Sequence, residues 1–254
     1  MRKIIKDLTD IPESLVVDDG NITHQRRKEL INSGEYVKED KFDSRYKTPD
    51  IKEKLEGLYH FKCAYCEFKV EQGQVEHYRP KTKYYWLAYS WDNLLYGCPT
   101  CNQFKKTDFE ITGQEVEPPK ITDDLSDINI WSSQRYDGQE KPKLLNPERD
   151  ELNGRFLFDI QGNVKGNNDS RADYTIETCR LNRDFLIDER RRIIDVFRDE
   201  IRAELLFSKD KEDSKAIVAS LVRAFERRST DETSPFTAFR QAAVAWLDEI
   251  IKAI

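Results

Sequence analysis

The chain has 254 residues and a formal net charge of −6 at neutral pH. This charge argues against a protein that binds nucleic acid unaided, because Lys and Arg contacts to phosphate supply most non-specific affinity. Charged residues make up 35% and hydrophobic residues 38% of the chain, which is too rich in apolar side chains for a disordered protein. With no apolar run near the roughly 20 residues that span a bilayer and no signal-peptide pattern, we expect a folded cytoplasmic protein without a membrane partner.

Residues 1–57 predict an N-terminal helical segment. A basic stretch that begins at His24 predicts a helix that ends at Gly34, with His24 on the solvated surface. Thr48–Asp50 places a hydroxyl, a proline and an acid in the order that favours a second helix start. We expect that helix to end at Gly57.

Residues 58–110 contain the candidate metal-ligating and catalytic residues, and we expect them to form a separate core. Alternation around Gly73 predicts a short β-hairpin in which residues 68–70 pair with residues 75–77. The aromatic stretch 84–91 predicts a helix packed on that hairpin. It could be core or a base-stacking platform, and we favour core because buried aromatic side chains dominate small cores.

Glycine and proline punctuate residues 111–169, which predict a loop-rich connector with a short hairpin at residues 155–164. Residues 170–254 predict a C-terminal helical bundle. Its long first helix is expected to be capped by Asn182, and its third helix to run over 236–254. Cys179 stands alone and is expected to be a buried small hydrophobe. The predicted fold class is α+β, mostly α-helical.

The other four of the five cysteines form two CxxC pairs, Cys63 with Cys66 and Cys98 with Cys101. Disulfides are rare in a reducing compartment, so the pairs indicate a metal site. Four thiolates suit tetrahedral Zn²⁺, with an iron–sulfur cluster as the alternative. Because four thiolates leave zinc no open position, we expect this metal to be structural and the chemistry to lie elsewhere.

A second set of residues accompanies the cysteines: Glu76 and His77 between the pairs, and Asn102 directly after the last cysteine. A neutral imidazole can take a proton from water near pH 7. Carboxylate and amide oxygens suit Mg²⁺ or Mn²⁺. Cationic side chains that could contact the phosphates of a nucleic acid lie close by. They are Arg79, Lys81, Lys105 and Lys106.

This order of CxxC, Glu-His, Asn93-Leu94 and CxxCN resembles the zinc-knuckle HNH (ββα-metal) endonucleases. The resemblance implies a hairpin that carries Glu76 and His77 and a helix that carries Asn102. It also implies His77 as the general base, Glu76 and Asn102 as ligands of a catalytic Mg²⁺ or Mn²⁺, and Asn93 as the brace of the intervening loop. Glu76 and Asn102 stand where many members have Asp and His, which leaves the metal preference open.

Longer segments carry a closer resemblance over about residues 55–150: KCAYCE, VEHYRPK, YYWLAYSWDNLLYGCPTCNQFKK and KLLNPERD. They resemble the PtuB family, the HNH subunits of Septu-type and retron-associated anti-phage systems. The resemblance implies an endonuclease that acts with a PtuA-type ATPase, and possible association with a retron reverse transcriptase and its nucleic acid.

Two other interpretations remain open. In one, the zinc knuckle is a non-catalytic module that binds nucleic acid or a partner protein, and Glu76-His77 is an incidental surface pair. In the other, which is compatible with a nuclease, the helical bundle is an adaptor that docks an ATPase. The sequence does not distinguish DNA from RNA as the substrate.

Overall fold

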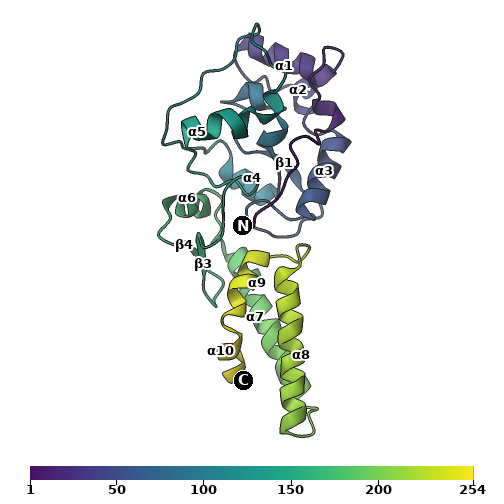
Figure 1. Ribbon diagram of the computed structural model, residues 1–254, viewed down its shortest axis with the longest axis vertical. Helices are drawn as coiled ribbons and strands as arrows, with labels where there is room; N and C mark the ends of the chain where they lie inside the picture. Colours follow the sequence, from purple (N-terminus) through teal and green to yellow (C-terminus); the bar gives the residue numbers. More distant parts are fainter. Residues whose placement is uncertain (254) are drawn as a thin grey trace. The chain divides into compact units, whose positions relative to one another are not determined.

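The computed structural model describes residues 1–253 (Figure 1). Ile254, the expected end of the last helix, lies outside them. The chain divides into two compact units. One comprises Lys3–Tyr65 and Lys69–Glu151, and the other comprises Met1–Arg2, Cys66–Phe68 and Leu152–Ile254. Among the described residues, no helix has the length and apolar character that crossing a membrane requires.

The first unit places short helices and turns around a two-stranded sheet. Its elements are the 3-10 turn η1 (Glu13–Leu15), α1 (Ile22–Ser33), α2 (Asp40–Asp43), α3 (Pro49–Tyr59), β1 (Gln74–His77), η2 (Tyr85–Leu87), η3 (Trp91–Asn93), β2 (Leu94–Gly97), α4 (Pro99–Lys105), η4 (Ile128–Ile130), the π-helical turn η5 (Ser132–Tyr136) and α5 (Asp137–Glu140).

The predicted hairpin between residues 68–70 and 75–77 is wrong. β1 pairs antiparallel with β2, so that His77 lies opposite Leu94. The segment after the first cysteine pair instead pairs with the segment before it. Lys69 forms a β-bridge with Lys62, and the Val70 amide donates to Phe61 O. The two segments that flank the first CxxC pair therefore bond each other, and β1 pairs with a strand that follows the aromatic stretch.

The aromatic stretch is core, as we favoured, but the predicted helix is wrong. It forms the two 3-10 turns η2 and η3. Two backbone carbonyls also bond side chains: Ala88 O lies 2.9 Å from His77 Nε2, and Leu87 O accepts a 3.2 Å bond from Asn93 Nδ2. Its large side chains are buried: Tyr84, Tyr85, Trp86, Leu87, Tyr89 and Trp91.

The predicted helix end at Gly34 is confirmed, since Gly34 caps α1 with a left-handed φ of 76°. The predicted surface position of His24 is wrong, because its side chain is only 4% exposed. Arg27, one turn later, is fully buried and bonds His24 Nδ1 at 3.1 Å and Tyr89 O at 2.7 Å. Arg27 thus reaches the aromatic core, while Arg26 and Lys28 pair with acids nearer the surface.

The helix start at Thr48–Asp50 is confirmed: Thr48 occupies the N-cap position of α3, although its side chain makes no capping hydrogen bond. The predicted end at Gly57 is wrong. α3 continues to Tyr59 and ends at His60, which has a left-handed φ of 51°. Tyr59 accounts for the extra residues, because its ring is buried on the inner face of the helix.

The second unit is mostly helical, as predicted. Figure 1 shows α7 and α8 running side by side as long helices, with α9 beside them. The predicted hairpin near 155–164 is confirmed by the antiparallel β3–β4 pair. The elements are β3 (Phe156–Phe158), β4 (Val164–Gly166), α6 (Ser170–Thr178), α7 (Asp184–Leu205), α8 (Lys211–Thr230), α9 (Thr237–Val244) and α10 (Leu247–Lys252).

Two details of this bundle differ from expectation. Asn182 does not cap α7, whose N-cap is Arg183. The Asn182 side chain instead bonds the backbone N–H and C=O of Val164 on β4. The single helix expected over 236–254 is broken into α9 and α10, and Trp246 at the break packs on Phe239. The burial predicted for Cys179 is confirmed. The two units together confirm the predicted fold class, which is α+β and mostly helical.

Candidate active site

Four cysteine sulfurs gather into one buried cluster. The Sγ atoms of Cys63, Cys66, Cys98 and Cys101 lie within 4.8 Å of one another. Cys98 caps α4, and its sulfur accepts the Cys101 amide at 3.3 Å. Tetrahedral zinc with sulfurs at about 2.3 Å separates those sulfurs by about 3.8 Å. The cluster therefore fits Zn²⁺ and leaves it no open position.

His77 is the last residue of β1 and is 8% exposed. Its Nε2 lies 2.9 Å from Ala88 O. Because a carbonyl oxygen only accepts, Nε2 carries the hydrogen and Nδ1 carries the lone pair. Burial, followed by the nearby Lys81 charge, lowers the pKa of His77 to about 3. The imidazole is thus neutral near pH 7, with its lone pair at Nδ1.

Glu76, the residue before His77, is buried and paired with Lys105 of α4. Lys105 Nζ lies 2.9 Å from Glu76 Oε1 and donates to His77 O at 2.9 Å. Burial raises the pKa of the Glu76 carboxyl, and the Lys105 charge acts in the opposite direction. Lys105, expected at a phosphate, is fully buried and instead ties α4 to β1.

A cavity of about 260 Å³ brings together several residues singled out in the sequence. Asn102 reaches it from α4, with Nδ2 donating to Gln74 Oε1 at 2.9 Å. The charged and polar side chains that line it include Tyr46, Glu76, His77, Lys81, Asn102 and Lys106. Glu76 and Asn102 could hold a hard cation here, provided that water and phosphate oxygens complete its shell, as is usual for Mg²⁺.

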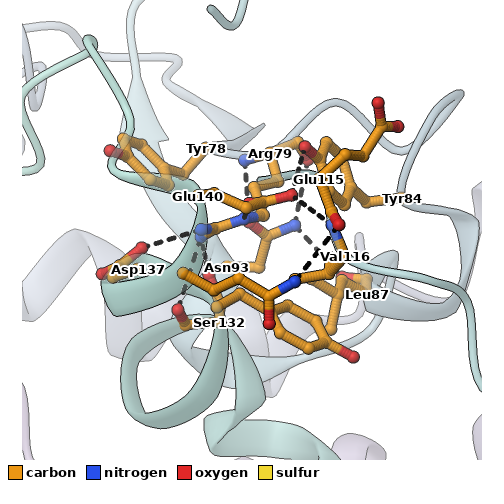
Figure 2. Close-up of polar contacts among 12 residues, drawn as sticks. Tyr78, Arg79, Tyr84, Leu87, Asn93, Glu115, Val116, Ser132, Asp137 and Glu140 are labelled. Carbon is orange, nitrogen blue, oxygen red and sulfur yellow. Dashed lines mark hydrogen bonds and ion pairs between the residues drawn. The ribbon is translucent and has the colours of Figure 1, made fainter. Parts of the chain in front are cut away.

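Asn93 lies behind the cavity and joins the two ends of the loop between β1 and β2. Its Oδ1 accepts the Arg79 amide at 2.8 Å, and its Nδ2 donates to Arg79 O at 3.0 Å (Figure 2). The same Nδ2 reaches Leu87 O. Asn93 is fully buried, so in this structure it contacts backbone and does not reach the cavity.

Arg79 is also fully buried, so it does not lie where a phosphate could reach it. Its Nε donates to Glu140 Oε2 at 2.8 Å, its Nη1 to Ser132 Oγ at 2.5 Å, and its Nη2 pairs with Asp137 at 2.9 Å (Figure 2). Tyr84 donates to the other Glu140 oxygen at 2.8 Å. Residues from the expected connector 111–169 thus hold the loop that follows His77.

Lys81 borders the cavity but is already engaged. Its ammonium donates to Asp43 Oδ1 at 2.9 Å, to Tyr36 OH at 3.3 Å and to Tyr46 OH. None of these three partners could be predicted from the sequence, because nothing local marks them and they precede the cysteine pairs. Only the fold reveals that Tyr46 lines the cavity and that Tyr36 and Asp43 hold Lys81 beside it.

Lys106 differs from the other cations at the site. It lines the cavity, its side chain is exposed, and it ends α4 with φ 47° and ψ −116°. Positive φ is costly for a residue with a Cβ and often accompanies functional sites. Of the four predicted phosphate contacts, Lys106 is the one placed to meet an incoming anion without breaking a described ion pair.

Residues 63–108, which include the four clustered cysteines and the elements β1, β2 and α4, match the HNH endonuclease family. Over 200 residues the chain is 26% identical to Septu protein PtuB of Bacillus mycoides (strain KBAB4). That alignment covers 72% of this chain and 64% of the relative, less than two thirds of its length. The chain is therefore PtuB-like. No solved structure matches it.

Proposed function

We propose that the chain is a metal-dependent endonuclease that hydrolyses phosphodiester bonds of DNA or RNA. The observation that carries the proposal is the His77 imidazole, whose Nε2 hydrogen is held by Ala88 O so that the lone pair lies at Nδ1, in a cavity shared with Glu76 and Asn102. A neutral base beside hard oxygen ligands is what attack of water on a phosphodiester requires.

In the proposed reaction His77 Nδ1 takes a proton from water as the water oxygen bonds to phosphorus. The bond from phosphorus to the sugar oxygen then breaks, and that oxygen gains a proton from solvent. The Ala88 carbonyl stabilises the imidazolium by accepting from Nε2 throughout. A Mg²⁺ or Mn²⁺ ion, when bound, would neutralise charge on the phosphate and the leaving oxygen.

The remaining residues take supporting roles in this proposal. Glu76 and Asn102 would hold the catalytic cation, and Lys106 would contact a neighbouring phosphate. Asn93 would keep the loop in register through its backbone contacts. For Arg79 and Lys105 we propose positioning in place of phosphate contact, since both are buried and bonded within the protein.

We further propose that the nuclease is the effector of an anti-phage complex with a PtuA-type ATPase. The similarity to a Septu protein supports this proposal. The net charge of −6 also supports it, because a nuclease with a net negative charge benefits from a partner that binds the substrate. A retron reverse transcriptase with its nucleic acid is proposed only on the sequence resemblance.

The alternative is a non-catalytic zinc-knuckle module that binds nucleic acid or a partner. The two functions differ in a second metal site. The experiment is to titrate Mn²⁺ into zinc-loaded protein and follow its paramagnetic resonance, for wild type and for Glu76→Gln and Asn102→Ala. In parallel, plasmid DNA and total tRNA are incubated with the protein and Mg²⁺ or Mn²⁺, with and without the ATPase.

The nuclease hypothesis expects Mn²⁺ binding, strengthened by nucleic acid and weakened in both variants, together with cleavage of at least one substrate. Nucleic-acid binding with no Mn²⁺ site and no cleavage, even with the ATPase present, would support the binding module instead.

A further inference from the structure

Tyr46 forms a wall of the active-site cavity, although it lies outside the segment 63–108 that matches the HNH family. Its ring packs edge-on against the imidazole of His77. The ring centroids are 4.6 Å apart and the planes cross at 82°. Tyr46 is buried. Segment 36–46 therefore supplies a direct contact to the proposed general base.

The Tyr46 ring is itself fixed at its hydroxyl end. Lys81 Nζ donates to the hydroxyl, and Asp43 Oδ1 lies 3.4 Å from it. The Lys81 ammonium also lies 4.3 Å from the Tyr46 ring centroid and 4.4 Å from that of Tyr36. These cation–π contacts and the Lys81–Asp43 ion pair leave Tyr46 little freedom to rotate.

His77 needs such a wall because its other anchor is a single hydrogen bond. The bond from Nε2 to Ala88 O fixes one ring atom and the tautomer, but a ring held at one atom can still tilt about that contact. Tilting moves Nδ1, the atom with the lone pair. A displacement of about 1 Å at a reacting group can cost about 10²-fold in rate.

We propose that Tyr46 is a positioning residue for His77. Its ring removes the tilt of the imidazole and keeps Nδ1 directed at the attacking water. The ring carries this role, and the Lys81 ammonium over its face, paired with Asp43, backs the ring. This inference rests on the proposed nuclease function, and it adds a residue to that site.

The experiment compares Tyr46→Phe, which keeps the ring, with Tyr46→Leu, which removes it. Tyr36→Phe, in the same cluster, is the matched control for loss of a hydroxyl. Cleavage of whichever nucleic acid the wild type cuts is measured in single-turnover and steady-state assays, alongside zinc content. We expect Tyr46→Phe and Tyr36→Phe to stay within about 3-fold of wild type. For Tyr46→Leu we expect kcat to fall about 10- to 100-fold with KM within about 3-fold.

A second measurement does not depend on activity. In protein labelled with ¹⁵N at histidine, we expect the His77 ring of wild type and Tyr46→Phe to give sharp Nε2–H signals. In Tyr46→Leu those signals should broaden or shift, while those of His24 and His60 stay unchanged.

The inference is overturned if Tyr46→Leu retains kcat and leaves the His77 signals unchanged, or if its loss appears in KM and equally in Tyr36→Phe. Failure of the nuclease function is a different result: wild type and His77→Ala would then be equally inactive on every substrate, with the ring signals still reporting on the Tyr46 contact.

Discussion

Lys105 Nζ lies 2.9 Å from Glu76 Oε1, and both side chains are withdrawn from solvent. Removing one member of a buried pair leaves the other charge uncompensated, which typically costs about 3–5 kcal/mol. We therefore expect Lys105→Met to lower the free energy of unfolding by about that amount, measured by urea denaturation. The double variant Glu76→Gln/Lys105→Met should recover much of the loss, because no charge is then buried alone. Additive losses in the double variant would contradict a direct pairing.

Lys106 offers the opposite test, because its side chain is exposed at the cavity. We expect Lys106→Met to leave stability within about 0.5 kcal/mol and to weaken nucleic-acid binding. The slope of log K against log salt should fall in magnitude by about 1, as for loss of one phosphate contact. Lys120→Met, exposed on a loop outside the cavity, is the control. An unchanged salt slope in Lys106→Met would exclude the proposed phosphate contact.

The cysteine cluster gives a metal-removal test. We expect about one zinc ion per chain and its loss in Cys98→Ser, with unfolding of the region around α4 because binding and folding of such sites are coupled. Cys179→Ala is the control, since Cys179 is buried outside the cluster. Zinc is measured by mass spectrometry and local unfolding by hydrogen exchange. Full zinc content in Cys98→Ser would show that the four sulfurs do not share one ion.

The sequence was sufficient for the parts of this fold that depend on local spacing. Two CxxC pairs predicted the metal cluster, apolar periodicity predicted the C-terminal helices, and glycine spacing predicted the β3–β4 hairpin. The aromatic stretch was misjudged as a helix because its periodicity is compatible with one. Its Leu87 and Ala88 carbonyls also bond the side chains of Asn93 and His77, and such contacts cannot be read from periodicity.

The same limit applies to the candidate site. Glu76, His77 and Asn102 could be proposed from their places beside the cysteines. Tyr46 could not, because its contact with His77 joins segments without a shared motif. Arg79 looked like a surface cation because its partners, the buried Glu140 and the partly exposed Asp137, come from a loop-rich stretch without periodicity.

His24 provides a pH test away from the active site. Burial, then the charges of Arg27 and Lys28, lower the pKa of folded His24 to about 4, whereas an unfolded histidine titrates near about 6.5. Between these values the unfolded chain binds the extra proton, so this contribution to stability is present above about pH 6.5 and is lost as pH falls toward 4. We expect wild type to lose more stability than His24→Gln between pH 7.5 and pH 5 in urea denaturation. Equal losses would place His24 in solvent.

The central claim is that His77 is the general base. The most direct measurement is the single-turnover cleavage rate of the purified protein, with its ATPase partner if cleavage requires it, for wild type, His77→Ala and His60→Ala, with zinc content and binding measured in the same samples. We expect His77→Ala to lower the rate by about 10²- to 10⁴-fold with zinc and nucleic-acid binding retained, and His60→Ala, outside the cavity lining, to remain near wild type. An undiminished rate in zinc-loaded His77→Ala would contradict the account.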